Sequence, residues 1–296
     1  MCPREFRKTR PWASRPTRSQ PIAPNIGCQQ AKLRESRASG RVDEGGPEIA
    51  RPVGDFLLAH SLFDVLALLA GLAAFRCVPM PPAGSMPPWQ RHPLYLPVAT
   101  IGVTAGAYLL GSLNLWLTGI GGIARSIEGG LAGGILAVET LKAVTGMRGS
   151  TGLSLAAPLA AAIVVGRIGC FLAGIDDMTY GTPTALPWAV DFGDGIPRHP
   201  VQLYESMTMA VFLAVFLVLL RRGHPLALRA GFYLFIGVYA GQRFLWEFLK
   251  PYGTVLGPLN LFHLLSLALV AYAILQARKE MVEPCTTSAT STPLRV

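Results

Sequence analysis

The sequence has little charge for its length. Only 15% of its 296 residues are Asp, Glu, Lys or Arg, and 51% are hydrophobic. An ordinary soluble domain carries about 25% charged residues. So few charges leave too little polar surface for a water-exposed fold of this size. The composition therefore predicts an integral membrane protein.

The cysteines are few and scattered. Five occur along the chain, at Cys2, Cys28, Cys77, Cys170 and Cys285. An odd number without regular spacing matches neither a disulfide framework nor a metal-binding motif. We therefore expect no metal, no redox centre and no cofactor.

Much of the basic charge lies at the N-terminal end. Eleven of the 26 Lys and Arg residues precede Gly54, in a segment rich in Arg, Pro and Ser without an apolar period. This segment reads either as a disordered basic tail or as the result of a start codon assigned too far upstream. We expect a disordered basic tail over 1–54, a transmembrane domain over 55–280 and a disordered C-terminal tail over 281–296. Because much of the basic charge lies in this tail and no groove of aromatic and basic residues is visible elsewhere, a nucleic-acid binder is excluded.

Seven apolar runs are long enough to cross a bilayer, which takes about 17 to 25 residues each. They lie at 56–75, 94–117, 127–145, 153–174, 201–220, 230–249 and 258–276. The expected fold is all-α, with about seven transmembrane helices and a polar loop between helices four and five. With the N-terminus outside, nine basic residues fall in inner loops and three in outer loops (Arg125, Arg198 and Lys250). This asymmetry places the C-terminus in the cytoplasm.

Polar residues gather around the loop between the fourth and fifth runs. Gly166-Arg167-Ile168-Gly169 lies near the end of the fourth run, Asp176 and Asp177 follow, and His199 precedes the fifth. Near the bilayer centre an arginine costs about 2.5 to 3.5 kcal/mol on insertion scales, so it more often serves a site than a lipid-facing surface. His199 is either an interfacial histidine or a proton carrier, since its unperturbed pKa is about 6.5.

Two carboxylates share a face of the third run. Glu128 and Glu139 are eleven residues apart, which is close to three helical turns and about 16 Å along the axis. They are too far apart to act as one catalytic dyad. The glycines between them form two pairs with small-xxx-small spacing, which predicts close contact with another helix. These glycines are Gly129, Gly130, Gly133 and Gly134.

The sixth run carries an ion pair. Arg243 and Glu247 are four residues apart, so their side chains can meet on one face of a helix. Such a pair is either structural or the border of a polar cavity. With Arg167 it supplies two guanidinium groups near one membrane face. Guanidinium stays protonated and offers five fixed donors, which suits a phosphate. The functional interpretation is a phospholipid headgroup site.

Together these residues resemble the prolipoprotein diacylglyceryl transferase family of bacterial inner membranes. The resemblance covers most of residues 55–280, and it rests on several short motifs. These are Gly166-Arg167-Ile168-Gly169-x-Phe171, Gly174, Tyr180-Gly181-x-Pro183-Thr184, Leu186-Pro187-Trp188, Arg198-His199-Pro200-x-Gln202-Leu203-Tyr204-Glu205 and Arg243-x-x-x-Glu247-Phe248.

The resemblance implies a reaction at the outer face of the cytoplasmic membrane. The family moves a diacylglyceryl group from phosphatidylglycerol to the thiol of a lipobox cysteine in a prolipoprotein and releases glycerol phosphate. Arg167 and Arg243 would hold the phosphate, Glu247 would orient Arg243, and Glu128 or His199 would take the thiol proton. Further candidates to bind substrate are Cys170, Gly174, Asp176, Asp177, Gln202, Tyr204 and Glu205.

The chain departs from the family at several of these positions. Glu128 stands where the family has a histidine before a Gly-Gly pair, and Cys170 replaces an asparagine. Asp176 or Asp177 would substitute for the acidic residue after Gly174. These departures describe a divergent member. They leave two alternatives open: a related lipid transferase with a different acceptor, and a noncatalytic lipid-binding or transport protein of the membrane.

Overall fold

The computed structural model describes residues 53–282, apart from 79–89, 91, 120 and 148. Nearly all of the two tails predicted over 1–54 and 281–296 lies outside these residues. Within the described part the fold is almost entirely helical. The long helices are α2 (Val53–Phe75), α4 (Tyr95–Leu117), α5 (Ile127–Thr145), α6 (Leu153–Ala173), α7 (Val201–Arg221), α8 (Pro225–Glu247) and α9 (Leu261–Val282).

Four of the described helices are long and apolar enough to cross a membrane: α4, α6, α7 and α9. Large apolar side chains also face outward. Examples are Leu68 on α2, which is 62% exposed, and Trp116 on α4, which is 76% exposed. In water, apolar patches of this extent mark a binding surface or an aggregation risk. Lipid is the environment in which such helices are stable, so the membrane prediction is confirmed at this level.

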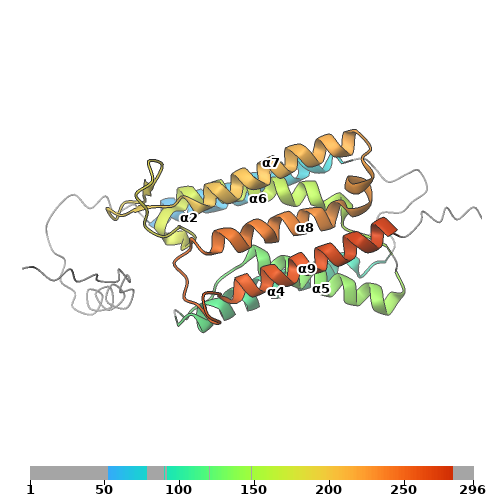
Figure 1. The fold of residues 1–296 in the computed structure, drawn as a ribbon, viewed down its shortest axis with the longest axis horizontal. Coiled ribbons are helices and arrows are strands. Elements are labelled where there is room, and N and C mark those ends of the chain that lie inside the picture. The colour runs from blue at the N-terminus through green and yellow to red at the C-terminus, as the bar shows by residue number, and fades with distance from the viewer. Residues whose placement is uncertain (1–52, 79–89, 91, 120, 148, 283–296) are drawn as a thin grey trace, which may run out of the picture. The chain divides into compact units, whose positions relative to one another are not determined.

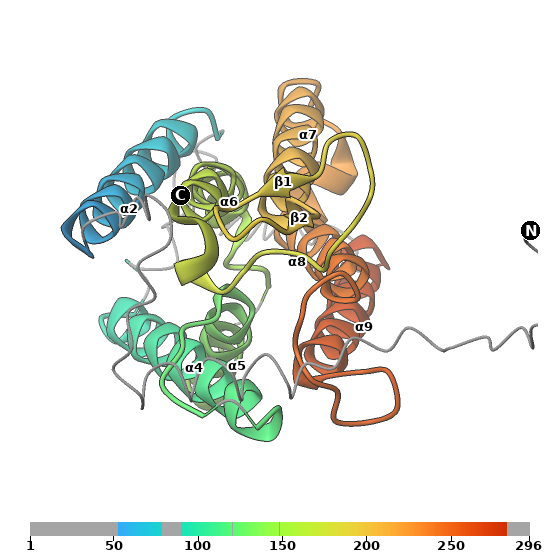
Figure 2. The same ribbon diagram turned by 90° about the vertical axis from the view of Figure 1, so that its left-hand side faces the viewer.

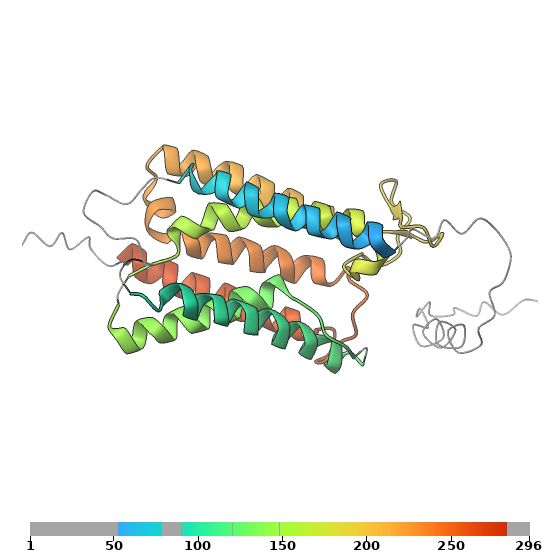
Figure 3. The same cartoon turned by 180° about the vertical axis from the view of Figure 1, so that it is seen from behind.

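The helices pack in pairs. α2 lies against α6, α4 against α5 and α8 against α9, and α7 contacts both α6 and α8. Figure 1 shows α8 between the group of α2, α6 and α7 and the group of α4, α5 and α9. Seen from behind, α2 lies along α6, and α4 lies along α5 (Figure 3). α8 therefore connects the two groups, through α6 and α7 on one side and α9 on the other.

Glycines bring α4 and α5 into close contact, as the small-residue spacing predicted. A Cβ atom on Gly106 would lie 2.8 Å from the Cα of Gly133, and one on Gly129 would lie 2.9 Å from the Cβ of Leu110. Since real Cβ atoms do not approach other atoms this closely, only glycine fits at these positions.

Helix ends follow local capping rules. The Ser126 side chain accepts a hydrogen bond from the Gly129 N–H at the start of α5, and Gly146 ends this helix with φ +72°. Two boundaries predicted from hydropathy were wrong. α8 begins at Pro225 rather than 230, because His224 caps a first turn that Arg229 separates from the longer apolar run. α9 extends past 276 to Val282 through a polar last turn.

The polar segment between α6 and α7 has its own structure. It begins with a 3₁₀ turn, η1 (Gly174–Asp177), and contains a short hairpin of β1 (Val190–Asp191) and β2 (Pro197–Arg198). Figure 2 views the helices from this end, with the hairpin beside α6 and α7. The Gly181 N–H donates to the His199 carbonyl, and the Thr182 N–H donates to the Leu249 carbonyl. These bonds tie the segment to the starting turn of α7 and to the end of α8.

Candidate active site

A cavity of about 1200 Å³ lies between the two groups of helices. Side chains of α2, α4, α5, α6, α8 and α9 line it, together with the segments that follow α6 and α8. The two carboxylates predicted to share a face of α5, Glu128 and Glu139, both line it. Their spacing means that the cavity extends for about 16 Å along α5.

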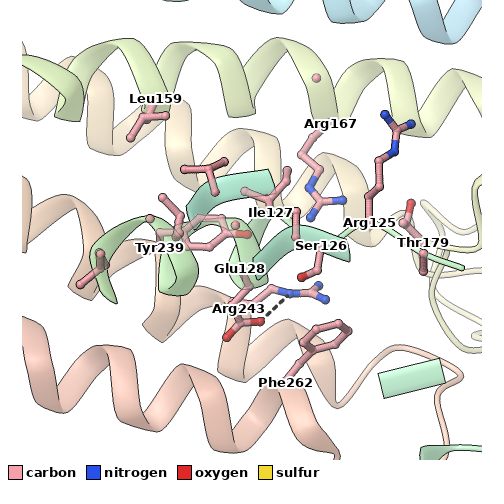
Figure 4. Close-up of a pocket in the computed structure, with 18 of the residues that line it drawn as sticks. Arg125, Ser126, Ile127, Glu128, Leu159, Arg167, Thr179, Tyr239, Arg243 and Phe262 are labelled. Carbon is pink, nitrogen blue, oxygen red and sulfur yellow. Dashed lines mark ion pairs between the residues drawn. The ribbon is translucent and has the colours of Figure 1, made fainter. Parts of the chain in front are cut away.

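One end of the cavity is strongly charged. Arg167 on α6 and Arg243 on α8 project into it from different helices, as Figure 4 shows. They are only 6% and 4% exposed. Lys250, in the segment after α8, lines the same end and is 5% exposed. Three buried cations in an apolar protein need carboxylate partners, because an unpaired buried charge is strongly unfavourable.

Glu205, near the start of α7, is the partner that all three cations share. Its Oε1 lies 2.8 Å from Arg243 Nη1 and 2.8 Å from Lys250 Nζ, and its Oε2 pairs with Arg167 Nε. The carboxylate is fully buried. The single carboxylate of Glu205 therefore holds the donor groups of all three cations at this end of the cavity, where an anionic ligand could contact them.

Arg243 also pairs with a carboxylate on its own helix and with one on α5. Its Nη2 lies 2.8 Å from Glu247 Oε2, so the predicted pair on α8 is confirmed, and its Nε lies 3.5 Å from Glu128 Oε2. The guanidinium carbon lies 5.3 Å from the centre of the Phe262 ring. These contacts fix the plane of the guanidinium and fix which edge faces the cavity.

Residues in α9 and directly before it position the carboxylates of Glu128 and Glu247. The Ser266 hydroxyl donates to Glu128 Oε1 at 2.5 Å, and Asn260 Nδ2 donates to Glu247 Oε1 at 2.8 Å. The described cluster contains three cations and three carboxylates, so its formal charges balance. An arriving anion would therefore meet cations that are already oriented, rather than side chains that must first be ordered.

Lys250 differs from the two arginines because it can lose its proton. It lies outside the helices, and its burial, together with the nearby positive charge of Arg243, lowers its pKa to about 8. The Glu205 carboxylate opposes this effect by stabilising the ammonium form. The positive charge at this end of the cavity is therefore sensitive to pH in the mildly alkaline range.

Tyr239, one helical turn before Arg243, points into the cavity as well (Figure 4). The residue is 1% exposed, and its hydroxyl has no hydrogen-bond partner in the described part of the chain. A buried hydroxyl usually has a partner. Its position beside the charged cluster makes it a further group able to contact a ligand.

The far end of the cavity is polar but internally paired. Glu139 Oε1 accepts hydrogen bonds from Lys142 Nζ (3.0 Å) and from the Tyr272 hydroxyl (3.1 Å), and the Tyr95 hydroxyl donates to Thr151. Apolar side chains line the wall between the two ends, among them Val103, Leu131, Ile135, Val138, Leu155 and Leu159. The cavity is thus charged at one end and apolar along its middle.

The other predicted site residues fall into two groups. Cys170 and Asp177 line the charged end, where the Thr179 hydroxyl donates to Asp177. Gly174 ends α6 with φ +73°, and the side chain of Asp176 lies outside what the structure describes.

His199, Gln202 and Tyr204 are not among the residues that line the cavity within the described chain. His199 Nδ1 lies 3.4 Å from the Tyr204 hydroxyl, which also accepts a hydrogen bond from Trp188 Nε1. The Gln202 side chain is buried with no hydrogen-bond partner among the described residues. The structure therefore groups Glu128, Glu205 and Glu247 with the cations, and places His199 elsewhere.

The sequence interpretation missed four residues of this cluster. Lys250 was counted only as a loop charge, and Asn260, Ser266 and Tyr239 were not singled out. Tyr239 and Lys250 follow helical spacing relative to Arg243 and Glu247, at four and three residues. That spacing was the available signal for both. Asn260 and Ser266 reach the site only through the packing of α9.

Comparison with known proteins gives a consistent result. A protein of Geobacter sulfurreducens is 33% identical over 186 residues, which cover 59% of this chain and 69% of the relative. A protein of Cupriavidus metallidurans is 35% identical over 161 residues, which cover 53% and 57%. One of Cupriavidus pinatubonensis is 41% identical over 99 residues, which cover 32% and 34%. All three are named phosphatidylglycerol–prolipoprotein diacylglyceryl transferase.

No solved structure matches the chain. The family model for prolipoprotein diacylglyceryl transferase matches residues 95–277, which run from the start of α4 into α9 and include every member of the charged cluster. With a match over more than half of its length, the chain belongs to the prolipoprotein diacylglyceryl transferase family.

Proposed function

We propose that the protein transfers a diacylglyceryl group from phosphatidylglycerol to the cysteine thiol of a prolipoprotein. The observation that carries the proposal is the convergence of Arg167, Arg243 and Lys250 on one end of a cavity whose middle is apolar. A phospholipid has the same division between a charged head and apolar chains. Its phosphate would lie against the cations and its acyl chains along the apolar wall.

The reaction forms a C–S bond and breaks a C–O bond. The thiolate of the acceptor attacks the glyceryl carbon attached to the phosphate oxygen, and glycerol phosphate leaves with the bonding electron pair. The thiol proton passes to a base and finally to the phosphate or to solvent. Negative charge grows on the departing phosphate, and preorganised cations in a site that excludes water stabilise such charge strongly.

Glu128 is our candidate for the base. It lines the cavity, and its carboxylate is fixed by the Ser266 hydroxyl and by Arg243. A thiol has an unperturbed pKa of about 8.5, so a nearby acceptor raises the reactive thiolate fraction. His199, the alternative, is paired with Tyr204 and does not line the cavity in the described chain. Its place favours a role in ordering the segment before α7.

Cys170, Asp177, Thr179 and Tyr239 would surround the phosphate or the acceptor. Cys170 lies one turn after Arg167 on the cavity wall, where the resemblance implies an asparagine. A thiol forms weaker hydrogen bonds than an amide. We therefore expect Cys170 to affect mainly which acceptor or which lipid headgroup the protein prefers.

We further propose that all seven long helices cross the cytoplasmic membrane, with the C-terminus in the cytoplasm. α2, α5 and α8 have 23, 19 and 23 residues, within the range of about 17 to 25 residues that a transmembrane helix needs. The test is a fusion of green fluorescent protein to the C-terminus. Fluorescence in cells supports this orientation, because the fluorophore does not form after export, and a dark but full-length fusion would contradict it.

The function is tested by transfer of labelled diacylglyceryl from phosphatidylglycerol to a lipobox peptide. Arg167→Ala and Arg243→Ala should abolish transfer while the protein still inserts into the membrane. Arg222→Ala is the matched control, because this arginine is exposed beyond the end of α7. Transfer at the wild-type rate in either site variant would contradict the phosphate-binding role.

A different acceptor, or lipid binding without catalysis, would give a distinct result. In the first case labelled lipid is consumed only when another thiol or hydroxyl compound is supplied. In the second, lipid remains bound and intact. Both outcomes would preserve the cavity as a phospholipid site and reject the lipobox cysteine as acceptor.

A further inference from the structure

Asn260, directly before α9, connects the end of α8 with the start of α9. Its Nδ2 donates to Glu247 Oε1 at 2.8 Å, and its Oδ1 accepts from the His263 N–H at 3.1 Å. The residue is 2% exposed. One side chain therefore caps α9 and holds a carboxylate of the charged cluster.

His263 completes a reciprocal cap. Its Nδ1 accepts from the Asn260 backbone N–H at 3.1 Å, so that each residue satisfies a backbone donor of the other. The imidazole ring lies 4.3 Å from the Phe248 ring and 5.3 Å from the Phe244 ring, measured between centroids. This packing fixes Asn260 against the last turns of α8.

The contacts continue from Asn260 to the substrate side. Glu247 uses one oxygen to accept from Asn260 and presents the other to Arg243 Nη2 at 2.8 Å. Asn260 itself is not among the residues that line the cavity in the described chain, whereas Arg243 is. The side-chain hydrogen bond from Asn260 to Glu247 is therefore the direct connection between this residue and the charged cluster.

We propose that Asn260 is a positioning residue that sets the orientation of the Arg243 guanidinium by holding Glu247. This inference rests on the proposed function, since it assigns Arg243 to the phosphate. Asn260 must accept a hydrogen bond to cap α9 and donate one to Glu247. An amide side chain does both, whereas an ionised carboxylate can only accept.

The substitution N260D separates these two roles. It retains an acceptor for the α9 cap, which aspartate provides as well as asparagine does. It removes the donor and places a second carboxylate beside Glu247. Two adjacent carboxylates bind a shared proton more tightly than an isolated one, and the protonated carboxyl can donate to Glu247 as the amide does. The N260D defect should therefore diminish as the pH falls.

Other charged and titratable groups surround this position in both proteins. They are Arg243 and Glu247 on α8, Lys250 after it, Glu128 on α5, Arg167 on α6, Glu205 on α7 and His263 on α9. The quantity to compare is therefore the ratio of N260D to wild-type transfer rates at each pH. Dividing by the wild-type rate removes the titration of the groups that N260D does not contact. Because His263 Nδ1 lies 3.0 Å from Asn260 Oδ1, the same ratio is also measured in a His263→Gln background, where the rise towards pH 6 should persist.

The test measures this ratio from pH 8 to pH 6, with labelled phosphatidylglycerol and a lipobox peptide. We expect a ratio of about 0.01 to 0.1 at pH 8, because misplacing a substrate-positioning group costs up to about a hundredfold. The ratio should rise at least about fivefold by pH 6 as the new carboxyl takes up its proton. A ratio near one throughout, or a low ratio that does not change with pH, would overturn the proposal.

A double-mutant cycle gives a second reading that does not need N260D to fold. If Asn260 acts through Glu247, N260A should lower transfer in the wild-type background and change it by less than about twofold in the E247Q background. Additive losses would mean that Asn260 acts only on stability, and would reject the positioning role. Absence of transfer by the wild-type protein would instead reject the proposed function itself.

Discussion

Arg243 makes three contacts through three different nitrogens, and this geometry separates it from lysine. Nη1, Nη2 and Nε face Glu205, Glu247 and Glu128 at 2.8, 2.8 and 3.5 Å. A lysine has one nitrogen at the end of a flexible chain. Arg243→Lys therefore keeps the positive charge but cannot retain all three contacts.

The size of the effect follows from these contacts. The lysine would keep at most one of the two contacts at 2.8 Å and lose or weaken the longer one to Glu128. A hydrogen bond to a charged group contributes about 1.5 to 3 kcal/mol. The total loss is then about 2 to 4 kcal/mol, which corresponds to a decrease of about 30-fold to 1000-fold in rate if it falls on the transition state.

The assay is steady-state transfer from phosphatidylglycerol to a lipobox peptide, together with thermal unfolding in detergent. Arg222→Lys is the control for a general effect of the substitution. We expect kcat/KM to fall into the stated range for Arg243→Lys and to stay unchanged for the control. If Arg243→Lys kept more than half of the wild-type kcat/KM and its unfolding temperature, the three-contact geometry would not matter and the reasoning would be refuted.

Three further predictions concern packing, pH and the base. Gly106→Ala should lower the unfolding temperature, because its Cβ would collide with α5, whereas Gly241→Ala, with open space around it, should leave the temperature unchanged or raise it. Lys250 has a folded-state pKa of about 8, below the usual 10.5. Its ammonium therefore disappears above about pH 8. The KM for phosphatidylglycerol should rise there in the wild type and stay flat in Lys250→Arg. As the pH rises from about 8 to 10.5, the free energy of unfolding should increase, because in this interval the unfolded chain holds the Lys250 proton and the folded chain does not. Glu128→Gln should abolish transfer while phosphatidylglycerol binding persists, and His199→Gln should retain most transfer. The reverse result would make His199 the base.

Local sequence patterns were sufficient for contacts within a helix. The pairing of Arg243 with Glu247 follows from their four-residue spacing, and the shared face of Glu128 and Glu139 follows from three turns. The glycines of α5 predicted a close helix neighbour for the same reason. In each case the period of the helix determines which side chains lie together.

Contacts between helices were beyond the reach of these patterns. Glu205 was expected to bind substrate, yet its role as the common partner of three cations depends on how α6, α7 and α8 pack. Lys250 looked like an ordinary loop charge because its burial comes from that packing. The two wrong helix boundaries have a simpler origin, since hydropathy alone does not register capping residues such as His224 or a polar final turn.

The most direct test of the central claim is transfer of labelled diacylglyceryl by the purified protein. It should pass from phosphatidylglycerol to the cysteine of a lipobox peptide, with release of glycerol phosphate, and not to the same peptide with serine in place of cysteine. We predict thiol-dependent transfer that Arg243→Ala abolishes. A folded preparation that binds phosphatidylglycerol but yields no thioether product, or a product equally abundant with Arg243→Ala, would contradict the assignment of this cavity as a diacylglyceryl transfer site.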